Sequence, residues 1–247
     1  MNLVLLEAGE LNALGRVLLS GPRAAHIVNV LGATPGQTVR IGLVEGPRGV
    51  GTAGSIEGNT VALDCVLEAE TPPRPRVDLL LAVPRPKVMR RLWSHLAALG
   101  VSRIILTNAE RVERPYFDTH VLTPECYRPL LIEGLQQARD TRLPTVSIHR
   151  RFKVLVEDEL DALSDAGLRI VADPAATAPV RETVSRALDQ DRDARVLLAV
   201  GPEGGWNAFE LGLLDARGFR RIGMGPRTLR TDTACLALLA LVHDALA

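Results

Sequence analysis

Two rhythms of apolar and polar residues divide the chain near residue 70. Before that point lie short apolar runs with partial alternation, at residues 37–45, 49–57 and 59–70, separated by glycine, proline and asparagine. Period-two alternation between turn residues is typical of β-strands. The pattern therefore predicts a small, mostly β domain over residues 1–70, closed into a barrel.

A proline-rich segment follows this domain. Residues 71–76 read TPPRPR. Proline has no backbone N–H and suits neither a helix interior nor a central strand, so this segment is predicted to be a linker.

From residue 77 to residue 247, continuously apolar runs of strand length alternate with helical patterns. Strands are predicted at residues 77–83, 102–109, 145–150, 168–173, 195–200 and 219–225. Helices are predicted at residues 87–99, 124–138, 156–167, 178–190, 208–217 and 233–247, with a C-cap at Gly167 and a capping box of Asn207 and Glu210. This alternation predicts an α/β domain with a parallel sheet covered on both faces.

Composition narrows the class of protein. Hydrophobic residues make up 47% of the chain and charged residues 23%, as in ordinary folded proteins. The three cysteines form no C-x-x-C pair, and the five histidines show no ligand spacing, so no metal site is predicted. The start lacks the features of a signal peptide, and the apolar run at 234–242 is too short for a bilayer. A reducing cytoplasm fits best.

The net charge of zero argues against a nucleic-acid binder, because such domains are usually basic. The arginines nevertheless cluster, chiefly at residues 74–91, 111–114, 150–153 and 220–230. Each cluster is either a solvated face or a local RNA contact, and composition leaves both interpretations open.

Glycine-rich segments are the strongest candidates for chemistry. Residues 49–54, GVGTAG, match the dinucleotide pattern G-x-G-x-x-G, but a strand follows instead of a helix, so turn glycines are predicted. In contrast, GPEGG at 201–205 follows one predicted strand, GPRTLRTDTA at 225–234 follows another, and Asp173-Pro174 ends a third. Carboxyl ends of parallel strands meet at one edge, so these loops predict a ligand pocket. Glu203 favours a cationic or hydroxyl-bearing ligand over a phosphate.

The pair AVGPEGGWNAFE (199–210) and IGMGPRTLRTDTA (222–234) resembles the C-terminal signature of the RsmE family of SPOUT methyltransferases. That family transfers a methyl group from S-adenosyl-L-methionine to N3 of a uridine in 16S ribosomal RNA. Residues 24–39 are similar to its N-terminal barrel and residues 96–111 to its first βα unit. The chain departs from the family pattern at Gly32, Ala98, Met224 and Asp232.

The resemblance implies a PUA-like, RNA-binding β-barrel followed by a trefoil-knotted α/β methyltransferase domain that forms a homodimer. The implied partner is 16S ribosomal RNA or the assembled small subunit, with no membrane and no metal. The alternatives are a SPOUT methyltransferase acting on another ribosomal or transfer RNA site, or a non-catalytic RNA-binding assembly factor.

The resemblance also carries the site residues. For the cofactor these are Asp173, Val200, Gly201, Glu203, Gly204, Gly205, Ile222, Met224, Gly225, Thr228, Leu229, Arg230 and Thr233. Candidate RNA contacts are His26, Arg85, Arg111, Arg114 and Arg227.

The catalytic candidates are Arg230 and Asp232. A guanidinium suits the negative charge that spreads over O2 and O4 of a deprotonated uracil, which makes Arg230 the first choice and Arg227 the second. Asp232 is expected to be an N-cap or first-turn carboxylate, with a general-base role as the alternative. Glu203 is expected to accept a hydrogen bond within its own loop.

Overall fold

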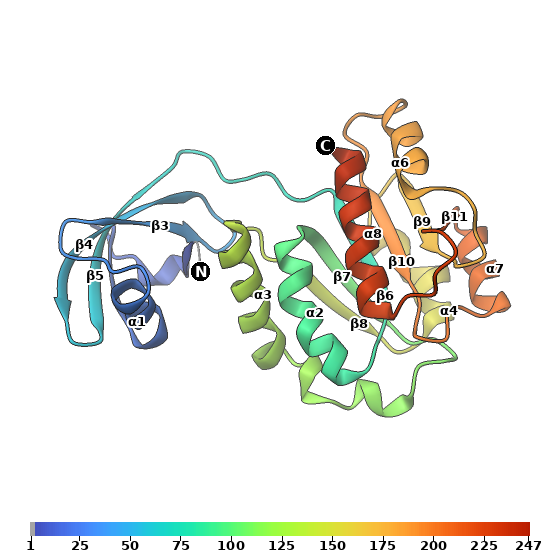
Figure 1. Cartoon of the computed structure of the whole chain (residues 1–247), viewed down its shortest axis with the longest axis horizontal. Helices are drawn as coiled ribbons and strands as arrows, with labels where there is room; N and C mark the ends of the chain where they lie inside the picture. Colours follow the sequence, from blue (N-terminus) through green and yellow to red (C-terminus); the bar gives the residue numbers. More distant parts are fainter. Residues whose placement is uncertain (1–2) are drawn as a thin grey trace. The chain divides into compact units, whose positions relative to one another are not determined.

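The computed structural model describes residues 3–247, so the first two residues of the predicted domain 1–70 lie outside it. The chain forms two compact units, Met1–Arg74 with Leu131–Leu143, and Pro75–Leu130 with Pro144–Ala247 (Figure 1). The boundary between Arg74 and Pro75 falls inside the segment 71–76 that was predicted to be a linker. The second part of one helix, from Leu131 onward, groups with the N-terminal unit.

Residues 3–74 of the N-terminal unit form a curled sheet, a 3₁₀ helix and one α-helix. Its elements are β1 Val4–Leu6, η1 Ala8–Glu10, β2 Arg16–Ser20, α1 Gly21–Asn29, β3 Thr38–Leu43, β4 Arg48–Glu57 and β5 Thr60–Leu67. The strand order is β1-β3-β4-β5-β2, antiparallel except for the β1–β3 pair. Leu6, Leu19, Ile27, Ile41 and Leu63 form its core. The alternation predicted β3, β4 and β5, whereas β1, β2 and α1 were not predicted.

The glycines of the segment 49–54 lie inside β4, so the prediction of turn glycines was wrong. A Cβ added at Gly49 would overlap the carbonyl oxygen of Val66 on the neighbouring strand. A Cβ at Gly51 would lie 3.1 Å from Cγ2 of Ile41 and 3.2 Å from Cδ1 of Leu63. Glycine at positions 49 and 51 therefore allows close packing in the sheet.

The C-terminal unit is a parallel sheet in the order β11-β9-β10-β6-β7-β8. Its strands are β6 Val77–Ala82, β7 Val101–Thr107, β8 Thr145–His149, β9 Leu168–Ala172, β10 Val196–Val200 and β11 Arg220–Ile222. Its longer helices are α2 Pro86–Ala98, α3 Pro124–Ala138, α6 Val180–Leu188, α7 Ala208–Ala216 and α8 Thr231–Leu246. Every residue of β6 and β10 is buried, as expected for a sheet covered on both faces.

Two helices that are distant in sequence lie side by side over this sheet. Figure 1 shows α2 and α8 next to each other, and both contact strands of the sheet. Helix α6 packs against α8. Among residues 3–247, no helix is both long enough and apolar enough to cross a membrane. The predicted α/β class is confirmed, and the trefoil knot stays a prediction.

The helix predicted at 156–167 differs most from the structure. The segment folds as α4 Phe152–Val154, a π-helix η4 Leu155–Glu159 and α5 Leu160–Leu163. Its C-cap is Ser164, whose extended backbone ends the helix, so the predicted C-cap at Gly167 was wrong. The Ser164 hydroxyl donates a 2.7 Å hydrogen bond to the buried carboxylate of Asp78, and this distant partner ends the helix early. Short 3₁₀ helices, η2 Arg114–Phe117 and η3 His120–Leu122, precede α3.

Candidate active site

The carboxyl ends of β9, β10 and β11 surround one cavity. These three strands are neighbours and parallel, so their following loops meet at the same edge of the sheet. The cavity is lined by the following residues named from the sequence: Asp173, Val200, Gly201, Glu203, Gly205, Ile222, Met224, Gly225, Thr228 and Leu229. It is also lined by Ala172, Pro174, Pro202, Gly223, Arg227, Thr231, Ala234 and Leu238.

Glycines let these loops turn tightly beside the cavity. Gly205 has φ 73°, a left-handed conformation, and its N–H donates a 2.8 Å hydrogen bond to the carbonyl of Pro202. A Cβ at Gly201 would lie 3.1 Å from the indole of Trp206, which is buried. A Cβ at Gly223 would overlap the carbonyl oxygen of Ala176. The loops therefore present backbone to the cavity.

Helix α7 begins directly after this loop with the predicted capping box. Asn207 Oδ1 accepts the N–H of Glu210 at 2.8 Å, and Glu210 Oε2 accepts the N–H of Asn207 at 2.8 Å. Such a cap contributes about 1 kcal/mol and fixes where the loop ends. The prediction of this capping box is confirmed.

The two carboxylates of the cavity have different surroundings. Asp173 accepts the N–H of Ala175 at 2.9 Å through Oδ1 and pairs with Arg221 at 3.4 Å through Oδ2. Glu203 is exposed and makes no hydrogen bond to any residue in the range 3–247. The prediction that Glu203 accepts a hydrogen bond within its loop was wrong, and its exposed side chain lines the cavity instead.

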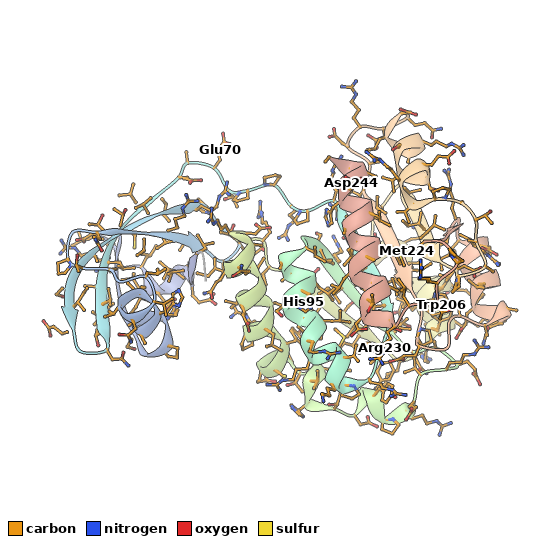
Figure 2. All side chains as sticks on the ribbon, viewed as in Figure 1. Glu70, His95, Trp206, Met224, Arg230 and Asp244 are labelled. Atoms are coloured by element: carbon orange, nitrogen blue, oxygen red, sulfur yellow. The ribbon has the colours of Figure 1, made fainter. Side chains whose placement is uncertain are left out.

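Arg230, Asp232 and Thr233 do not line the main cavity but an adjoining one. Arg230 is the N-cap residue of α8, and Figure 2 shows it at the N-terminal end of that helix. It lines the adjoining cavity with Arg91, Asp232 and Thr233. Within residues 3–247 its guanidinium has no hydrogen-bond partner.

Asp232 lies in the first turn of α8 and is not the N-cap. Its carboxylate pairs with Arg91 at 2.9 Å and accepts the N–H of Thr233 at 2.9 Å. The expectation of a first-turn carboxylate agrees with this position. Arg91 was not among the predicted site residues, because it approaches from α2, which is distant in sequence.

The candidate RNA contacts lie in different places. Arg85 lines a third cavity with Arg91, Glu203 and Arg230. Arg114 is exposed, and Arg227 lines the main cavity. Arg111 donates a hydrogen bond to the carbonyl oxygen of Gly204, so it contacts the glycine loop. His26 lies on α1 of the N-terminal unit.

One face of α8 also lines the main cavity, and it was not predicted from the sequence. Thr231, Ala234 and Leu238 line it, spaced three and four residues apart as on one helix face. That spacing was the signal that could have found them. Within residues 3–247, no group of histidine, cysteine, aspartate or glutamate side chains is arranged to hold a metal ion.

Fold and site together define a class of α/β protein that binds a ligand at the ends of parallel strands. Residues 71–243 match the family described as RNA methyltransferase domain. A curated relative, ribosomal RNA small subunit methyltransferase E of Treponema pallidum, is 33% identical over 246 residues, which is 98% of this chain and 90% of that protein. The chain belongs to this family of RNA methyltransferases, and the predicted resemblance to the RsmE family is confirmed.

Other comparisons agree with this assignment. Ribosomal RNA small subunit methyltransferase E 1 of Borreliella burgdorferi is 23% identical, over 96% of this chain and 95% of that protein. The crystal structure of a ribosomal RNA small subunit methyltransferase E from Neisseria gonorrhoeae, bound to S-adenosyl methionine, superposes with a TM-score of 0.75 at 20% identity. That match covers 99% of this chain and 97% of the other, and it supports the two-part fold.

Proposed function

We propose that this protein transfers a methyl group from S-adenosyl-L-methionine to N3 of a uridine in 16S ribosomal RNA, in the cytoplasm. The observation that carries the proposal is the cavity formed by the loops after β9, β10 and β11. It occurs in a chain that is 33% identical, over 98% of its length, to a ribosomal RNA small subunit methyltransferase E.

The lining of the cavity fits the cofactor. Val200, Ile222 and Leu238 offer an apolar surface for an adenine ring. The exposed carboxylate of Glu203 and that of Asp173 suit ribose hydroxyls or a positively charged ligand, and the glycines leave backbone groups accessible. The bound cofactor supplies an electrophilic methyl group on a sulfonium. Gly204, Arg230 and Thr233, also named from the sequence, belong to the rim of this proposed site.

Arg230 is proposed to stabilise the reacting base. N3 of uridine is a poor nucleophile until its proton leaves, and the resulting charge spreads over O2 and O4. The planar guanidinium of Arg230 offers several fixed donors for that charge and has no competing partner within residues 3–247. Asp232, already engaged by Arg91 and by the N–H of Thr233, is proposed to support the start of α8 beside the base.

RNA is proposed to contact both units. His26 in the N-terminal unit and Arg85, Arg114 and Arg227 in the other are the candidate contacts, since most protein contacts to nucleic acid reach the backbone. We further propose that the methyltransferase unit forms a homodimer. The substrate would be 16S ribosomal RNA, either naked or assembled into the small subunit.

The test is methyl transfer from labelled cofactor to naked 16S ribosomal RNA and to intact small subunits, followed by nucleoside mass spectrometry. The proposal predicts N3-methyluridine in at least one of these substrates. Label on another nucleoside, or on transfer RNA alone, would replace the proposed target. Calorimetry that shows no cofactor binding would favour the non-catalytic assembly factor.

A further inference from the structure

Two hydrogen bonds join the segment after β7 to the segment after β10, which contains the glycine loop and the start of α7. Glu110 and Arg111 belong to the first segment, and Gly204 and Glu210 to the second. The two segments are far apart in sequence, and the sheet order places β6 between their strands. Gly204, the acceptor of the Arg111 hydrogen bond, lies between Glu203 and Gly205, which line the main cavity.

Arg111 makes the first of these hydrogen bonds. Its Nη1 donates a hydrogen bond to the carbonyl oxygen of Gly204. Its aliphatic stem lies directly over the same residue, because a Cβ added at Gly204 would be 2.8 Å from Cδ and 3.5 Å from Cβ of Arg111. A side chain at position 204 would therefore displace Arg111 from its present position over the loop.

Glu210, whose side chain is buried, makes the second hydrogen bond. Its Oε1 accepts the N–H of Glu110 at 2.7 Å, while its Oε2 accepts the N–H of Asn207 at 2.8 Å. One carboxylate thus joins the segment after β7 to the start of α7. Between Gly204, whose carbonyl is held by Arg111, and Asn207, whose N–H is held by Glu210, lies Gly205 with its left-handed backbone.

We infer that Arg111 is a positioning residue that holds the glycine loop in its cofactor-binding conformation. Fixing the carbonyl of Gly204 fixes the direction of the peptide between Gly204 and Gly205, and with it the cavity wall. From the sequence alone, Arg111 is a candidate RNA contact. This inference rests on the proposed function, since it takes the cavity to be the cofactor site.

The two roles differ in what happens without RNA. If Arg111 positions the loop, Arg111→Ala lowers the affinity for S-adenosyl-L-methionine in the absence of any RNA. If Arg111 is an RNA contact, Arg111→Ala leaves cofactor affinity unchanged and weakens RNA binding. Loss of one charge-assisted hydrogen bond predicts a rise of roughly ten- to a hundredfold in Kd for the cofactor.

A double-mutant cycle tests the contact itself. Gly204→Ala has a tolerated backbone, because Gly204 is not among the residues of positive φ, but its Cβ would displace Arg111. Calorimetry on Arg111→Ala, Gly204→Ala and the double variant should show that each single change weakens cofactor binding. The second change should add little to the first. Arg111→Lys should restore part of the affinity, since it keeps one donor without the planar fork.

The control is Arg186→Ala, which removes an exposed arginine that pairs with Glu182 on the surface of α6. It should leave cofactor affinity unchanged.

In turnover assays Arg111→Ala should raise KM for the cofactor and leave kcat at saturating cofactor near wild type, a split that general destabilisation would not give. Amide hydrogen exchange at residues 203–207 should also speed up in the variant.

The outcomes separate the inference from the proposed function. If wild type binds and uses the cofactor, and Arg111→Ala binds it equally well, the positioning role is wrong and the proposed function stands. If Arg111→Ala and Gly204→Ala each lower the affinity and their effects simply add, the contact between them does not carry the effect. If wild type binds no cofactor, the proposed function fails first.

Discussion

At the scale of single residues, Gly205 links loop geometry to cofactor binding. Its φ is 73°, and a Cβ added there would meet no atom within 4 Å, so a larger side chain would occupy the cavity space. Gly205→Val should therefore weaken cofactor binding by at least tenfold without unfolding the protein. Because valine is also strained at positive φ, by about 1–2 kcal/mol, strain alone must be separated from this effect.

The matched control for this variant is Gly218→Val. Gly218 has φ 79°, its added Cβ also meets no atom within 4 Å, and it follows α7 away from the cavity. Both variants should lower the midpoint of thermal unfolding by similar amounts. Calorimetry that finds equal cofactor affinity for Gly205→Val and wild type would remove this cavity as the cofactor site.

Arg230 provides the second prediction at this scale. If it stabilises the developing uracil anion, its contribution appears in the transition state and not in cofactor binding. Arg230→Ala should lose roughly 10²–10³-fold in single-turnover rate, and Arg230→Lys should recover little, because a point charge cannot reproduce the planar fork. Cofactor affinity should change little.

The control for Arg230 is Arg220→Ala, because Arg220 is exposed on β11 and lines neither the main cavity nor the two cavities that Arg230 lines. It should keep the wild-type rate. The competing role for Arg230 is a grip on RNA phosphate, which predicts a shallower salt dependence of RNA binding and turnover restored at saturating RNA. Near wild-type single-turnover rates at saturating RNA and cofactor would end the catalytic assignment.

At the scale of elements, α8 carries a histidine that makes stability depend on pH. His243 is half-buried, and its buried Nε2 has no hydrogen-bond partner within residues 3–247. Burial, and then the nearby positive charge of Arg76, lower the pKa of His243 below its usual 6.5. The unfolded chain therefore takes up a proton at a higher pH than the folded one.

The sign of this linkage gives a prediction. The stability contributed by neutral His243 is complete above about pH 6.5 and is lost as the pH falls towards the lower folded pKa, by at most about 1.4 kcal/mol per pH unit. Urea unfolding of His243→Leu between about pH 8 and pH 5 should show a smaller fall in unfolding free energy than wild type. If the unfolding free energies of the two proteins change in parallel with pH, the buried neutral His243 does not make stability depend on pH.

The elements show which features local sequence can predict. The bounds of α3 and the capping box of α7 follow from helical periodicity and from Asn207 and Glu210, which act within a few residues. The end of α5 does not, because Ser164 turns to a partner on β6. The same limit explains the turn prediction for Gly49, whose constraint is a carbonyl on the neighbouring strand.

In the candidate site, too, features set by nearby residues were predicted and contacts between distant segments were not. The loops at residues 201–205 and 225–234 were predicted because each directly follows a strand of a parallel sheet. The pairing of Arg91 with Asp232 and the contact of Arg111 with Gly204 were not, since each joins segments separated by about a hundred residues or more. Their exposed arginines resemble any other surface charge in the sequence.

At the scale of the whole molecule, the apolar composition of α8 is mostly explained within one chain. Cys235, Leu238, Leu239, Val242 and Leu246 are all buried. Full burial raises the pKa of the Cys235 thiol to about 12, so this thiol is held as an inert apolar group. What remains outside is a short strip that includes Leu241, with 39% of its surface exposed.

The proposed homodimer would cover this strip, because two copies of α8 meeting around a twofold axis would each bury the other's Leu241. Wild type should then show twice the monomer mass by light scattering at micromolar concentration. Leu241→Glu should shift the mass toward the monomer, since an unpaired buried carboxylate strongly disfavours association. The control, Leu14→Glu, changes a leucine that is 80% exposed in the N-terminal unit and should stay dimeric. A monomeric wild type, or a Leu241→Glu variant as dimeric as wild type, would rule out a dimer built on this face of α8.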